Sequence, residues 1–229
     1  MTVTTNSLTR AAGAASVAAG LIFIGMQIDH PHLDVTSITT GDVVVRDALK
    51  VLMSALALAG LTGMYLGQAH RNGLLGLIGY LLLTPAYLLI MCTTFVAAFV
   101  LPAIAATDPS YVTDVIAAST GGTPTGDIGP LGTLIQVQGL AYLAGGLVFG
   151  IALYRARVLA RWASALLAVG GVVTVVLSLM PDAFYRLLAF PHGIAMIGLG
   201  YSLWRTAGRT ITTRPAPVNG PQVTTAGAE

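Results

Sequence analysis

Residues 29–50 have the sequence DHPHLDVTSITTGDVVVRDALK and separate two long apolar runs. This segment holds four of the eight Asp, two of the four His and the only Lys of the chain. A polar connection between two long apolar runs indicates two membrane-spanning helices joined at the membrane surface. The sequence His30-Pro31-His32 predicts the end of the first helix, because the residue before a proline avoids the α region.

The composition of the whole chain agrees with a membrane protein. The chain has 229 residues, of which 55% are hydrophobic and 9% are charged, whereas soluble domains carry about 25% charged residues. The bilayer is therefore expected to be the solvent for most of the surface. The net charge of +2 is small and the basic residues are dispersed, which excludes nucleic-acid binding. The single cysteine, Cys92, excludes an intrachain disulfide.

We predict an all-α polytopic membrane protein with six transmembrane helices and short loops. The expected spans are residues 11–28, 51–67, 74–101, 131–154, 162–180 and 184–204. The first run is longer than the apolar core of a signal peptide, about 7–15 residues, so we expect it to be retained. Residues 1–10 are expected to form a polar N-terminal segment and residues 11–204 the membrane domain. Residues 205–229 have too few apolar residues to pack and are expected to be disordered.

The longest connection covers residues 102–130 and is expected on the outer side. Asp108-Pro109 is typical of an N-cap followed by proline at the first helical position. Tyr111, Val112, Val115 and Ile116 would then share one face of a short amphipathic helix. Two interpretations stay open: this helix rests on the membrane surface, or it forms a lid over an outer cavity.

The distribution of basic residues predicts the orientation. With six spans, eight of the eleven basic residues fall on the same side as the two termini. The positive-inside rule then places both termini in the cytoplasm and the protein in the plasma (inner) membrane. All eight Asp fall on the opposite, outer side.

The candidate binding residues gather on that outer side. Asp42 and Arg46, and Asp47 and Lys50, are spaced to pair on a helix surface. His192 lies at membrane depth, where an ionisable residue is a functional candidate, although it could equally be a packed histidine bonded to a neighbouring helix. The expected ligand-binding residues are His30, His32, Asp47, Lys50, Gln136 and His192, with Gln27 and Gln138 nearby.

Metal, haem and catalytic sites are weakly indicated. His30 and His32, with Asp29 and Asp34, offer ligands that suit zinc or copper, but a site needs three or four converging ligands. A haem would need axial ligands on facing helices. We therefore expect no metal and no cofactor. The chain contains none of the common protease, hydrolase or nucleotide-binding motifs, so enzymatic activity stays open.

Several segments resemble a broad group of uncharacterised bacterial integral membrane proteins. These are HPHLDVTSITT, DALKVLMSALALAGLTGMYLGQ, GLLGLIGYLLL, TTFVAAFVLPAIA, GLVFGIALYRARVLARWASALLAVGG and GLGYSLWR, which together extend over about residues 18–205. The resemblance implies a multi-span membrane protein with no assigned activity. It assigns no catalytic residue.

Three functional hypotheses follow. The leading one is a non-enzymatic protein that binds or passes a small solute or lipid through a polar outer vestibule between the first, second, fourth and sixth spans. The second is a membrane-embedded enzyme that uses His192, Asp47 and Lys50 on a lipidic substrate. The third is an accessory subunit or homo-oligomer, in which glycine-rich helix faces such as Gly63-x-x-x-Gly67 bind a partner. Membrane lipids are expected partners in each case.

Overall fold

The computed structural model describes residues 3–28, 31–178 and 189–209, and all regular structure in these ranges is helical. Four helices are long and apolar enough to cross a membrane. They are α1 (Thr5–Gly25), α2 (Gly41–Leu66), α3 (Ala69–Phe99), which the short α4 (Leu101–Ile104) continues, and α6 (Pro130–Ala156). The prediction of an all-helical, membrane-compatible chain is therefore confirmed.

Two further long helices, α7 (Arg161–Ser178) and α9 (Ala189–Arg209), cover most of the fifth and sixth expected spans. Residues 179–188, where the fifth span was expected to end and the sixth to begin, lie outside the described residues, as do residues 210–229 of the expected tail. Residues 205–209 are helical rather than disordered. Helix α9 continues there because Leu203 and Ala207 are buried against the bundle.

Two helices begin before their expected membrane spans. Helix α1 begins at Thr5, because Thr4 and Ser7 form a capping box in which each side chain bonds the backbone of the other. Helix α2 begins at Gly41, so its first turns carry Asp42, Arg46, Asp47 and Lys50.

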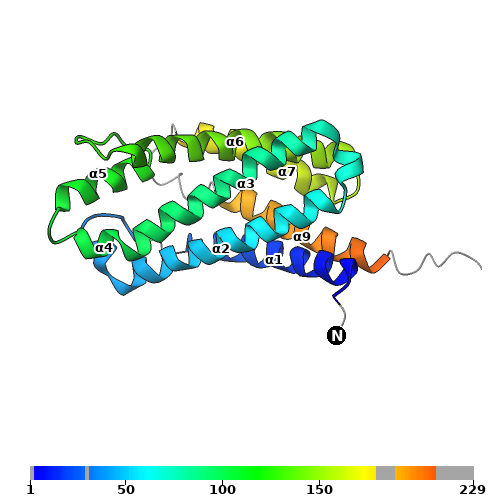
Figure 1. Cartoon of the computed structure of the whole chain (residues 1–229), viewed down its shortest axis with the longest axis horizontal. Helices are drawn as coiled ribbons and strands as arrows, with labels where there is room; N and C mark the ends of the chain where they lie inside the picture. The colour runs from blue at the N-terminus through cyan, green and yellow to red at the C-terminus, as the bar shows by residue number, and fades with distance from the viewer. Residues whose placement is uncertain (1–2, 29–30, 179–188, 210–229) are drawn as a thin grey trace, which may run out of the picture.

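The six long helices form a closed ring (Figure 1). Along the chain, α1, α2, α3, α6, α7 and α9 each pack against the next, and α9 packs back against α1. Neighbouring helices in the ring run antiparallel. Helices α4 and α5 (Pro109–Ser119) and the polar segment that follows α1 therefore lie together, at the end of the ring opposite the N-terminus. We call this the acidic end and the opposite one the basic end.

Glycine allows the helices to approach closely at most sides of this ring. On the antiparallel α1–α9 pair, a Cβ on Gly20 would lie 2.5 Å from the carbonyl oxygen of Gly193. Two helical turns further along the same pair, a Cβ on Gly200 would lie 2.6 Å from the carbonyl oxygen of Gly13. These distances are too short for any side chain, so the sequence positions are restricted to glycine. Glycine-rich faces such as Gly63-x-x-x-Gly67, which suggested a partner-binding surface, also pack largely within the chain.

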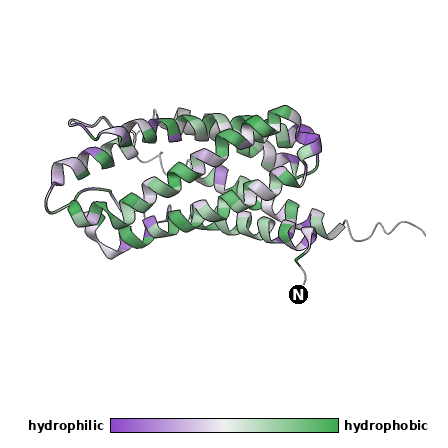
Figure 2. Ribbon diagram, in the orientation of Figure 1, coloured by the Kyte–Doolittle hydropathy of each residue, from purple (hydrophilic) through white to green (hydrophobic). Residues whose placement is uncertain are grey.

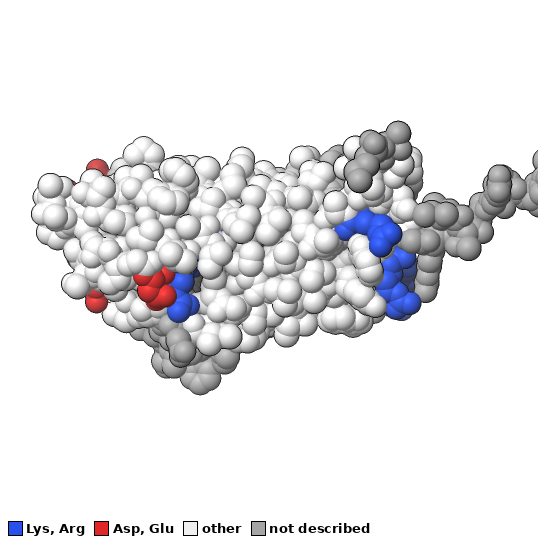
Figure 3. Space-filling view, turned by 90° about the horizontal axis from the view of Figure 1, so that it is seen from below, with Lys and Arg blue, Asp and Glu red and all other residues white. Residues whose placement is uncertain are grey.

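The surface of the bundle is apolar along its length and charged at its ends. Leu52, Leu81 and Leu140 lie within long helices and are 49%, 56% and 68% exposed. Figure 2 shows hydrophobic residues along the helices and hydrophilic residues mainly at the two ends. On the face drawn in Figure 3, basic side chains gather at the basic end, and acidic side chains lie at the other end beside a smaller basic patch. This is the pattern of a helical membrane protein, whose apolar side chains contact lipid.

Candidate functional site

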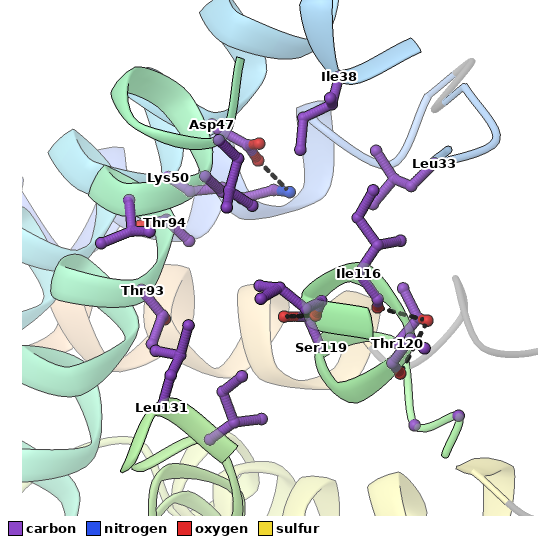
Figure 4. A pocket seen from close by; sticks show the side chains of 18 of the residues that line it. Leu33, Ile38, Asp47, Lys50, Thr93, Thr94, Ile116, Ser119, Thr120 and Leu131 are labelled. Atoms are coloured by element: carbon purple, nitrogen blue, oxygen red, sulfur yellow. Dashed lines mark hydrogen bonds and ion pairs between the residues drawn. The ribbon is translucent and has the colours of Figure 1, made fainter. Parts of the chain in front are cut away.

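A pocket of about 650 Å³ opens at the acidic end of the ring. Its walls come from α2, α3, α5, α6 and the segment that follows α1 (Figure 4). The prediction of a vestibule between the first, second, fourth and sixth spans is therefore partly wrong. Helices α3 and α5 contribute walls to the pocket, whereas no residue in the described part of α9 lines it. The correction arises because the ring order places α3 between α2 and α6.

An ion pair from α2 forms one polar wall of this pocket. Lys50 Nζ donates to Asp47 Oδ1 over 2.7 Å, as the three-residue spacing predicts. The side chain of Asp47 is only 6% exposed and that of Lys50 21%. The second predicted pair, Asp42 with Arg46, forms nearby at 3.0 Å, but Asp42 is exposed. Only Asp47 and Lys50 therefore present a largely desolvated pair of opposite charges to the cavity.

A second polar contact crosses from α3 to α6. Thr93 Oγ1 donates to Gln138 Oε1 over 2.9 Å, and both residues line the pocket together with Thr94. A hydrogen bond between helices in an apolar surrounding fixes their relative register. This contact places the Gln138 amide on the pocket wall.

The α5 side of the pocket is mixed, because Val115 and Ile116 are apolar whereas Ser119 and Thr120 are polar. Val112 and Val115 of α5 are buried in a small hydrophobic cluster with Ile38 and Leu101. Ile116 lies beside the cavity on the same helix (Figure 4). The predicted short helix is therefore confirmed, and its Val115 and Ile116 line the cavity. The lid interpretation stays a prediction.

Two aspartates hold α5 in this position. Asp108 caps the helix, because its Oδ1 accepts from the Tyr111 backbone N–H over 3.0 Å. Asp114 accepts from the backbone N–H groups of Thr125 at 2.7 Å and Gly126 at 3.0 Å, which folds the following loop back onto the helix. These backbone donors lower the pKa of both carboxyl groups below the usual range. Both carboxylates therefore remain ionised at neutral pH.

The structure brings together only part of the expected set of binding residues. His32, Asp47 and Lys50 line the pocket, whereas His30 lies outside the described residues. Gln136 is exposed on α6 and does not line the pocket; Gln138 takes that place. Two residues two positions apart on a helix point in nearly opposite directions, so only one of them can face the cavity.

His192 belongs to a separate buried cluster inside the ring. Its Nε2 lies 2.8 Å from the Tyr87 hydroxyl, and its ring stacks on Tyr142 with centroids 4.8 Å apart. The Phe23 ring lies edge-on to the His192 ring, with centroids 6.0 Å apart. Residues from α1, α3, α6 and α9 thus meet on one histidine, which fits the interpretation of a packed histidine bonded to a neighbouring helix. The structure does not unite His192 with Asp47 and Lys50, so the catalytic set of the enzyme hypothesis is not assembled.

Sequence analysis missed Tyr87 and Tyr142. Aromatic residues inside apolar helices are common, and nothing in the spacing links Tyr87 to a histidine 105 positions away. Within the described ranges, no three His, Cys, Asp or Glu residues gather closely enough to hold a metal ion.

Replacing Tyr87 by phenylalanine is expected to lower the free energy of unfolding by about 1–3 kcal/mol, because buried His192 would lose its partner. The matched control is Tyr80→Phe on the same helix. Its hydroxyl lies 3.1 Å from Thr62 Oγ1, which also bonds the carbonyl oxygen of Leu58, so Thr62 stays partnered. Denaturant unfolding in detergent measures both losses. Equal losses would show that the Tyr87–His192 hydrogen bond stabilises the fold no more than the Tyr80–Thr62 contact does.

The fold and the pocket define a class: a helical, membrane-compatible bundle with an amphipathic pocket at one end. No protein-family model, no curated protein and no solved structure matches the chain. The resemblance to uncharacterised bacterial membrane proteins stays a prediction.

Proposed function

We propose that the chain crosses the plasma membrane six times, with the basic end and both termini in the cytoplasm. The support is the separation of charge. By the bounds of their helices, five arginines lie near the helix ends at the basic end, where short turns join the helices: Arg10, Arg71, Arg155, Arg161 and Arg205. The positive-inside rule applies best to short loops of this kind. In this orientation the pocket opens toward the outer side.

We infer that the pocket binds a small amphiphilic molecule, such as a single-chain lipid. The observation that carries this proposal is the presence of the largely buried Asp47–Lys50 ion pair and of apolar side chains such as Ile116 in one cavity of about 650 Å³. Sites for small ligands have volumes of about 300–1,000 Å³ and combine an apolar lining with a few placed polar groups. A polar head would lie against Asp47, Lys50 and Gln138, and an apolar tail against Ile116 and its neighbours.

Binding is better supported than passage through the ring. Toward the basic end the interior of the ring is filled by fully buried side chains, among them Leu61, Leu83 and Phe149. Interiors packed in this way leave few voids larger than a water molecule. A solute that entered the pocket would meet this core.

The test uses the full chain in nanodiscs and 11-(dansylamino)undecanoic acid, a fluorescent fatty-acid analogue. Saturable binding above that of empty nanodiscs is expected. The double variant Asp47→Leu/Lys50→Met should weaken binding by about tenfold, which corresponds to the loss of one charge-assisted contact. Gln136→Leu, on the outer surface of α6, should bind as the parent does. Equal affinity in all three proteins, or no saturable binding in the parent, would refute the proposal.

A further inference from the structure

A second concave surface lies at the basic end, between α7 and α9. It encloses about 300 Å³ and is lined by Trp162 at the start of α7 and by Tyr201, Ser202, Arg205 and Thr206 of α9. Tyr201, Ser202 and Arg205 follow the spacing of one helix face. We call this surface the basic groove. It is distinct from the pocket at the acidic end and shares no residue with it.

The groove carries a positive charge that forms no ion pair with the carboxylates of the described ranges. Arg205 is exposed, and its guanidinium lies 5.7 Å from the centre of the Tyr201 ring. Both ion pairs found among the described residues are at the acidic end. Helix α7 begins at Arg161 beside the groove, so the positive end of its dipole adds to the charge there.

Hydroxyl groups lie next to this charge. The Ser202 Oγ accepts from the Ala160 backbone N–H over 3.0 Å, which orients the hydroxyl at the entrance to α7. Its hydrogen can donate to an anion held by Arg205. A guanidinium with an adjacent hydroxyl suits a phosphate group, whose oxygens accept several hydrogen bonds at once.

An apolar track leads from the groove along the bundle. Trp162 and Tyr201 flank the groove and are 59% and 53% exposed. Val169 lies seven residues after Trp162 on α7, and Ile194 seven residues before Tyr201 on α9, so each pair shares a helix face. Val169 and Ile194 are 52% and 41% exposed. The exposed apolar side chains therefore continue from the charged groove toward the middle of the bundle.

We propose that the basic groove binds an anionic phospholipid. Arg205 and Ser202 hold the phosphate of the headgroup, Trp162 and Tyr201 lie at the level of the glycerol backbone, and Val169 and Ile194 contact an acyl chain. Aromatic residues favour this interfacial level, and basic pockets between membrane helices suit anionic headgroups. A zwitterionic lipid lacks the net negative charge that would complement Arg205.

The experiment is native mass spectrometry of the detergent-purified chain with phosphatidylglycerol or phosphatidylcholine of identical acyl chains. The parent protein is expected to retain phosphatidylglycerol about tenfold more tightly than phosphatidylcholine, as the loss of a charge-assisted contact predicts. Arg205→Gln should remove this preference. Arg71→Gln makes the same charge change at an exposed position of the same end, outside the groove, and should keep it.

Three outcomes would overturn the proposal. Equal loss in the two variants would show a general effect of net charge. Equal retention of the two lipids by the parent would show that the groove does not select charge. Displacement of phosphatidylglycerol by millimolar inorganic phosphate would identify a free anion as the occupant. Thermal unfolding of both variants checks that the exposed substitutions leave the fold intact.

Discussion

Replacing Gly145 by valine is expected to force α3 and α6 apart and to lower the free energy of unfolding by about 2–3 kcal/mol. A Cβ on Gly145 would lie 2.6 Å from the backbone nitrogen of Leu83 and 2.7 Å from its Cα. Backbone atoms cannot rotate away as a flexible side chain can. The helices must therefore separate, and the reciprocal contact of Gly79 with Phe149 on the same helix pair would loosen with them.

The matched control is Gly139→Val on the same helix. Gly139 is exposed, and a Cβ there meets nothing within 4 Å. Both substitutions change helix propensity in the same way, so the difference between them reports only the contact with α3. Thermal unfolding in detergent measures that difference. A midpoint for Gly145→Val as high as that of Gly139→Val would contradict the close approach of α3 and α6.

Replacing Lys50 by methionine is expected to destabilise the protein by about 3 kcal/mol, because the nearly buried carboxylate of Asp47 would lose its counter-charge. The double variant Asp47→Leu/Lys50→Met should recover most of that loss, since it leaves no unpaired charge in the pocket wall. Denaturant unfolding of Lys50→Met, Asp47→Leu and the double variant completes the cycle.

The neighbouring pair supplies the comparison. Asp42 is 58% exposed at its side chain and bonds Arg46, which also donates to the carbonyl oxygens of Met26 and Ile28. Asp42→Ala should therefore cost less than about 1 kcal/mol, the usual range for exposed pairs. If Lys50→Met costs no more than Asp42→Ala, the Asp47–Lys50 pair is solvated and the proposed polar wall is wrong.

The sequence predicted those features that depend on neighbouring residues. Apolar runs gave the helical segments, the three- and four-residue spacings gave both ion pairs, and Asp108-Pro109 gave the start of α5. Local chemistry decides each of these, because the interacting groups are at most four positions apart.

Features that depend on which helix faces which could not be predicted. The choice of Gln138 over Gln136 depends on the rotation of α6 against α3, and the partner of His192 depends on the ring order. Apolar helices in a membrane have little hydrophobic patterning to define an inner face, because both faces are apolar. The contact of α5 with the pocket likewise joins segments that are distant along the chain.

The contact of α1 with α9 has a consequence for biosynthesis. Among the described helices α1 is made first, but one side of it packs against α9, which is made last. At about 5–20 residues per second, α1 would wait roughly 10–30 s in the bilayer with the glycine face at Gly13 and Gly20 uncovered. Completion of the bundle is therefore a late event, and a nascent chain interrupted before α9 would leave α1 exposed to quality-control proteases.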